Sequence, residues 1–128
     1  MNFIQIILLI AAVLTGALAL FQLLLAAGLP LGRFAWGGQN IRLPKKLRIF
    51  SSISSILLVY ASIVVLERSE IINIIDNKAI IAISSGIFVF IFGLSTLGNL
   101  TSKSKSEKKV MTPIAIYLVV AFLLAIIR

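Results

Sequence analysis

Four long apolar runs constrain this chain more than any other feature of its sequence. They cover residues 3–27, 47–66, 79–98 and 110–127, and none carries an ionisable side chain near its middle. A helix needs about 20 residues to cross the roughly 30 Å hydrocarbon core of a bilayer, so each run is long enough, the last one only just. We therefore predict an all-α, polytopic membrane protein whose four transmembrane helices pack as a small bundle, with residues 1–128 forming a single membrane domain.

The composition agrees with a membrane protein and excludes several kinds of chemistry. Hydrophobic residues make up 60% of the chain and charged residues 12%, with a mean hydropathy of +1.14. These values lie outside the range of soluble globular domains. The chain has no cysteine and no histidine, which excludes disulfides, thiolate chemistry and the usual metal ligand and proton carrier.

The positive charge is concentrated in two of the three connections between these runs. Nine of the twelve basic side chains lie in the first and third connections or at their edges. Because cytoplasmic loops are rich in Lys and Arg, we expect both termini outside and both basic loops in the cytoplasm. Such a basic face attracts anionic lipid headgroups, and we expect membrane lipids, not nucleic acid, as its partners. Apart from Arg33, which belongs to the loop described below, its members are Arg42, Lys45, Lys46, Arg48, Lys103, Lys105, Lys108 and Lys109.

Small residues recur at helical spacing along three of the runs. Small side chains let helix backbones approach closely in lipid, so these stripes predict helix packing surfaces. The serines among them could instead line a polar pathway, although serine can satisfy its hydroxyl on its own helix. The predicted packing residues are Ala12, Gly16, Ala19, Ser51, Ser55, Ser62, Ala82, Gly86 and Gly93.

Segments 15–28 and 84–98 share a spacing of small residues, and a proline follows each at a similar distance. Pro44 and Pro113 would then each open the second helix of a pair. This pattern suggests two helical hairpins in the same orientation, as in transporters built from parallel repeats. Chance resemblance between apolar helices, in which glycine is common, is the simpler explanation.

The first connection contains an unusual loop, "GLPLGRFAWGGQN", at residues 28–40. Gly28 is well placed to end the first helix, and Gly37 with Gly38 predicts a turn with left-handed backbone angles. Trp36 suits the aromatic belt at the membrane interface. The loop is either a structural turn with an aromatic anchor or a lipid-headgroup or ligand site, and it either stays at the surface or re-enters the bilayer edge. The candidate binding residues are Arg33, Trp36, Gly37, Gly38 and Gln39.

The carboxylates lie outside the four apolar runs, in the predicted connections. They are Glu67, Glu70, Asp76 and Glu107, and we expect the first two to be exposed to solvent. General acid–base catalysis needs a positioned side chain of suitable pKa, and none is identified. We therefore predict no catalytic residue, no metal site, no cofactor and no enzymatic activity. Segment 69–77, rich in isoleucine, is either a short interfacial helix or a continuation of the neighbouring spans.

The loop also carries a family resemblance. The run "AGLPLGRFAWGGQN", followed by "LPKKLR" at 43–48, resembles a group of small, uncharacterised bacterial integral membrane proteins that share a G-x-P-L-G-x-x-x-W-G-G-Q loop. The resemblance covers roughly a third of the chain. It implies a bacterial plasma membrane and supplies no catalytic residue.

Two functions remain open on the sequence. The first is a non-enzymatic accessory or interaction protein that contacts partner proteins or anionic lipids. The second is a small homo-oligomeric transporter or channel for a neutral or lipophilic solute. Gln22, Tyr60 and Tyr117 are the neutral polar groups that could contact such a solute.

Overall fold

The computed structural model describes all 128 residues and contains helices and no strands. Each of the four long helices is long and apolar enough to cross a membrane, so the predicted all-α, four-span membrane fold is confirmed. Two short 3-10 helices lie in the first connection. In chain order the elements are α1 (Phe3–Ala26), η1 (Gly32–Phe34), η2 (Trp36–Gly38), α2 (Lys45–Arg68), α3 (Lys78–Leu100) and α4 (Lys105–Ile127).

The helix ends are held by local hydrogen bonds, which matters because unpaired backbone groups are costly in or near lipid. The side chains of Asn2 and Gln5 form a reciprocal capping box at the start of α1. Asn77 caps α3 and Ser104 caps α4 without a reciprocal bond, each with its side-chain oxygen accepting from a backbone N–H three residues on. Gly28 follows the end of α1 at φ +94°, the left-handed conformation that commonly terminates helices.

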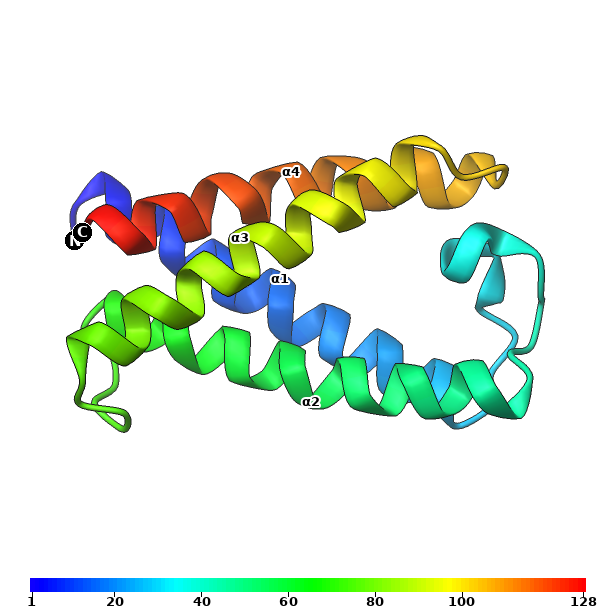
Figure 1. Cartoon of the computed structure of the whole chain (residues 1–128), viewed down its shortest axis with the longest axis horizontal. Helices are drawn as coiled ribbons and strands as arrows, with labels where there is room; N and C mark the ends of the chain where they lie inside the picture. The colour runs from blue at the N-terminus through cyan, green and yellow to red at the C-terminus, as the bar shows by residue number, and fades with distance from the viewer.

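The helices form two hairpins that pack side by side. Helix α1 packs along α2, and α3 packs along α4, while the hairpins meet mainly through α1 with α4 and α2 with α3. Figure 1 shows both chain ends and the connection 69–77 at one end of the bundle, and the other two connections at the opposite end. We call these the terminal end and the loop end.

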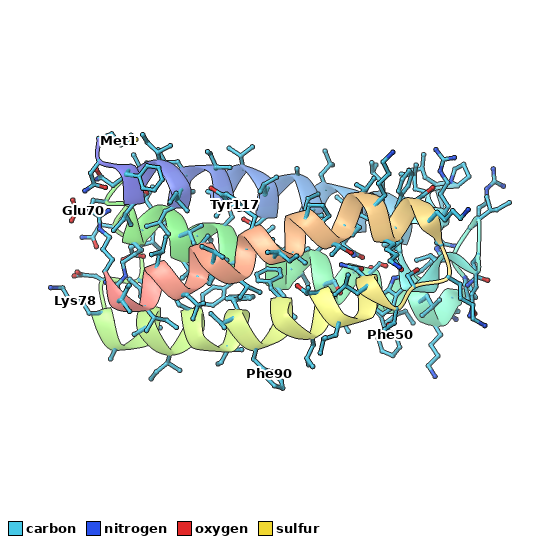
Figure 2. All side chains as sticks on the ribbon, turned by 90° about the horizontal axis from the view of Figure 1, so that it is seen from above. Met1, Phe50, Glu70, Lys78, Phe90 and Tyr117 are labelled. Carbon is cyan, nitrogen blue, oxygen red and sulfur yellow. The ribbon has the colours of Figure 1, made fainter.

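The core between the helices is aromatic at its centre. Phe88 and Phe92 of α3 pack on Phe122 of α4, with ring centroids 5.3 and 5.5 Å from it. Leu8 and Val64 are fully buried beside them. The outer surface is also apolar, and Figure 2 shows Phe90 pointing away from the bundle, as expected for helices surrounded by lipid.

The two tyrosines of the chain tie the hairpins together. The hydroxyl of Tyr60 on α2 lies 2.6 Å from Oγ of Ser84 on α3. The hydroxyl of Tyr117 on α4 donates to the backbone carbonyl of Ile7 on α1 across 2.9 Å. Hydroxyl groups of this kind act as interhelical hydrogen-bonding groups in lipid.

Helix α4 begins five residues before the predicted span 110–127. Ser104 provides the N-cap, and Pro113 lies inside the helix instead of opening it. A proline at this position removes one backbone hydrogen bond, which neighbouring helices can compensate in a membrane bundle. The predicted role of Pro113 as a helix start is therefore wrong.

Segment 69–77 is neither an interfacial helix nor a continuation of the spans. It consists of turns and bends, and the buried carboxylate of Glu67 organises it. The Glu67 oxygens accept the backbone N–H groups of Ile75 and Asp76 across 2.8 and 2.6 Å. The expectation that Glu67 is exposed to solvent is also wrong, because these N–H groups draw its carboxylate inward.

Candidate functional site

A cavity of about 260 Å³ lies between the two hairpins, in the half of the bundle nearest the loop end. We call it the hairpin cavity. All four long helices and the first connection contribute to its wall, and 14 of its 19 lining residues are hydrophobic. Aromatic rings supply much of this apolar wall, from Phe21, Phe34, Trp36, Phe88 and Phe92. A concave, mostly apolar space with a few polar groups is the usual form of a small-molecule site.

The polar side chains of the cavity come from each of the four long helices. They are Gln22 of α1, Ser54 of α2, Ser95 and Asn99 of α3, and Glu107 of α4. The side-chain oxygen of Gln22 is buried and has no hydrogen-bond partner within the protein. Glu107 is only 6% exposed, and it is the one ionisable residue in the wall.

Glu107 is the principal site residue that the sequence analysis missed. We expected it in the third connection, whereas it lies in the first turn of α4 and is buried. The sequence contains a signal that identifies this turn, because "SKSE" at 104–107 has the S-x-x-E pattern of a helix start. Hydropathy alone places the helix start too late and leaves Glu107 outside it.

Residues 28–40, which we call the glycine loop, lie at the loop end, between the beginning of α2 and the beginning of α4 (Figure 1). It has its own small core, formed by Leu25, Ala35 and Leu43. The loop therefore folds back over the bundle as a packed segment, and Phe34, Ala35 and Trp36 become part of the cavity wall.

Gly32 and Gly38 of this loop leave no room for a side chain, because other parts of the protein approach their backbone closely. The Gly32 N–H donates to the carbonyl of Ile41 across 2.8 Å, and a Cβ at Gly32 would collide with the backbone of Asn40. Gly38 has φ +70°, and a Cβ there would collide with Ser104, which caps α4. The Ser104 hydroxyl also donates to the carbonyl of Arg33. These contacts join the first connection to the second hairpin.

Trp36 connects the loop to α2. Its indole N–H donates to Oγ of Ser51 across 3.0 Å, and its ring lies 6.2 Å from that of Phe50. Trp36 is 39% exposed and has φ +52°, an uncommon angle for a residue other than glycine. Trp36 is thus an anchor for the loop as well as a wall of the cavity.

The other predicted binding residues of the loop do not converge with Trp36 on the cavity. Arg33 is exposed, with its guanidinium carbon 4.7 Å from the centroid of the Phe34 ring. The Gly38 N–H is used in a turn with the carbonyl of Ala35. Neither Gly37 nor Gln39 lines the cavity. Of the predicted set, only Trp36 reaches it.

The predicted packing residues separate into two groups. Ser55 and Ser62 of α2 donate to the carbonyls of Ala19 and Ala12 of α1, across 2.8 and 3.0 Å. Ser51 is fully buried and accepts from the Trp36 indole. Ser55, Ser62, Ala19 and Ala12 thus contribute to the contact between α1 and α2, whereas Ser51 joins α2 to Trp36.

The glycines of the stripes behave differently. Gly16 is exposed, and a Cβ there would meet no other atom within 4 Å; Gly93 has the same open surroundings. Gly86 lies within reach of Ile126 of α4, and Ala82 is half-buried. Gly16 and Gly93 are therefore not points of close helix contact within this bundle. The helices instead pack through larger side chains and through the serines.

The eight residues of the predicted basic face are all exposed at the loop end or in the first turns of the adjoining helices. Arg48 also has a structural contact, because its Nε donates to the carbonyl of Ala26 across 2.8 Å. Its guanidinium lies over Gly28. The positive charge of Arg48 is thus held close to the C-terminal end of α1, where a basic group is favourable.

A second, polar cavity of about 280 Å³ lies at the terminal end. Its wall combines acidic side chains, including Glu67 and Glu70, with basic side chains, including Arg68 and Arg128. Arg128 forms an ion pair of 3.7 Å with the exposed Glu70. Because charges of both signs are interspersed, this region suits a solvated junction between chain segments more than a ligand site.

The chain contains no group of three or more His, Cys, Asp or Glu side chains that could hold a metal ion. Comparison with protein families, with curated proteins and with solved structures finds no match. Functional inference therefore depends on the geometry of the site.

Proposed function

We propose that this chain is a non-enzymatic membrane protein that binds a small, largely apolar molecule in the hairpin cavity. The observation that carries the proposal is the cavity itself, walled by aromatic rings and containing few polar groups. Such a space matches the general form of small-molecule sites, which occur between the helices of bundles. Binding is the first step of the transporter alternative, so the cavity favours a solute-handling role.

The arrangement of the hairpins supports access to this cavity. The tyrosine hydrogen bonds lie away from it, and none of their four residues lines it. At the loop end the hairpins are joined through the glycine loop instead, by its contacts with Ser104. Loops open with smaller free-energy changes than packed helices do. We infer that a ligand enters by displacement of this loop.

A second role, as an accessory protein on anionic lipid, is favoured by the basic face. Its eight exposed side chains gather at one end of the bundle, where each contributes about 1 kcal/mol of attraction to an anionic surface. We propose that this end faces the cytoplasm of a bacterial plasma membrane and that the termini lie outside. The distribution of basic residues supports this orientation.

Native mass spectrometry of the protein released gently from its own membrane tests ligand binding. We expect a small organic molecule to copurify, and the same spectra give the oligomeric mass. Ser54→Phe places a ring in the cavity and should remove that molecule. Ser52→Phe is the matched control, because Ser52 is exposed on the same helix and does not line the cavity.

Loss of the molecule in Ser54→Phe alone would support the proposal. Copurification of anionic lipid only, equal in all three proteins, would contradict it and favour the accessory role. A protein partner whose binding is insensitive to Ser54→Phe would likewise count against a ligand cavity.

A further inference from the structure

The chemistry of the hairpin cavity points to the charge of its ligand. Glu107 is the only ionisable residue in the wall, and no basic side chain faces it there. Lys103, Lys105, Lys108 and Lys109 surround it in sequence, but all four are exposed. A charged side chain that is almost wholly buried within the protein is costly unless it has a partner, so Glu107 is a candidate for contact with a ligand.

The Glu107 carboxylate does not accept the backbone hydrogen bond that its position in an S-x-x-E sequence predicts. In an S-x-x-E capping box, the glutamate side chain accepts from the backbone N–H of the N-cap serine. Here the Ser104 side chain does cap the Glu107 N–H, at 3.3 Å. The Ser104 N–H, however, donates to Oγ of Ser102 across 3.1 Å. No hydrogen bond or ion pair is formed by the Glu107 carboxylate, although the residue is more than nine-tenths buried.

Gln22 supplies a second hydrogen-bond acceptor in the same wall. The side-chain oxygen of Gln22 is buried without a donor. A carboxylate and an amide oxygen are both hydrogen-bond acceptors, so a ligand that satisfies them must donate hydrogen bonds or carry positive charge. Aromatic rings attract cations through their π electrons. Trp36 is the aromatic residue of the same wall that is best suited to this contact, because the Arg33 guanidinium already lies over the Phe34 ring.

We infer that the hairpin cavity binds a small organic monocation, an amine or ammonium compound with an apolar body. The cation compensates the Glu107 carboxylate, and the body occupies the aromatic part of the wall. This inference rests on the proposed function, because it specifies the ligand class of the same cavity.

A matched pair of probes tests the ligand class. Benzyltrimethylammonium and neopentylbenzene have nearly the same shape and differ by one positive charge. Trp36 is the only tryptophan and lines the cavity, so its fluorescence reports binding by the purified full chain in nanodiscs of a neutral lipid. Empty nanodiscs correct for partition of the probes into lipid.

We expect the wild-type protein to bind the cation roughly tenfold more tightly than its neutral isostere, which corresponds to about 1.4 kcal/mol. Glu107→Gln should reduce the affinity for the cation to that of the isostere and leave the isostere unaffected. Glu70→Gln is the matched control, since it removes the same charge from an exposed residue at the terminal end, where Glu70 pairs only with Arg128. It should change neither affinity.

Equal affinity of the wild-type protein for the two probes would overturn the cation inference while leaving the proposed function intact. Failure of both probes to bind saturably would contradict the proposed function itself. The wild-type comparison decides the ligand class even if Glu107→Gln does not fold.

Discussion

The indole nitrogen of Trp36 and the hydroxyl of Ser51 are 3.0 Å apart, and their hydrogen bond fixes the glycine loop to the second turn of α2. Ser51 is completely buried, so its oxygen has no access to water as an alternative partner. The loop that closes one end of the hairpin cavity is therefore held from inside the bundle. This hydrogen bond therefore holds both the glycine loop and the Trp36 wall of the hairpin cavity in place.

Replacing Ser51 by alanine should destabilise the protein, because it leaves the Trp36 N–H without its acceptor. We expect the free energy of unfolding to fall by about 1–3 kcal/mol, the cost of an unsatisfied polar group. Denaturation in detergent, followed by circular dichroism, measures the change. Ser52→Ala is the control and should alter stability by less than about 0.5 kcal/mol, since Ser52 is exposed and bonds only to its own helix. Equal effects of the two variants would contradict the anchoring role.

The glycine loop should tolerate no side chain at Gly38. Gly38→Ala forces a Cβ against Ser104 at a left-handed backbone angle, and we expect a loss of about 1–3 kcal/mol in the free energy of unfolding. Gly16→Ala makes the same chemical change in open space on α1. It should be neutral or stabilise by up to about 1 kcal/mol, because alanine is the better helix former. The same detergent denaturation compares them, and a harmless Gly38→Ala would show that the loop does not pack on the second hairpin.

The tyrosines should contribute to the association of the hairpins. Tyr60→Phe and Tyr117→Phe each delete one hydroxyl that bridges the hairpins, and we expect each to cost about 0.6 kcal/mol, the mean for such bonds in membrane bundles. The two contacts join different helix pairs, so the double variant should cost about the sum. Unfolding by a denaturing detergent gives these values. A double variant as stable as the wild type would mean that packing alone holds the hairpins together.

The absence of cysteine allows a direct test of the proposed orientation. Asn73→Cys places a thiol in the second connection and Lys103→Cys places one in the third, and both positions are exposed. A membrane-impermeant maleimide should label Asn73→Cys on intact cells and Lys103→Cys only after the membrane is opened. The reverse pattern would contradict the orientation inferred from the basic residues.

The sequence was sufficient to predict the four long helices, because each apolar run is long and lacks charged residues near its middle. It also placed Gly28 correctly at the end of α1 and the left-handed turn at Gly37 and Gly38. These features depend on local hydropathy and on the conformational freedom of glycine, which can be read residue by residue.

The site could not be read in the same way. The hairpin cavity combines residues from α1, α2, α3 and α4 that are far apart in sequence, and hydropathy does not specify which helix faces meet. For the same reason the stripe containing Gly16 predicted contact where the structure leaves open space. Glu107 was missed because a charged residue at the edge of an apolar run looks like part of a solvated loop.

A single fluorine resonance can report directly whether the hairpin cavity binds a small molecule beside Trp36. Incorporation of 5-fluorotryptophan labels this one site, and neopentylbenzene is titrated into the protein in nanodiscs. We expect a saturable shift of the resonance in the wild type and in Ser52→Phe, and none in Ser54→Phe. A shift that grows linearly with ligand and is the same in all three proteins would indicate partition into lipid, and it would rule out ligand binding in the hairpin cavity.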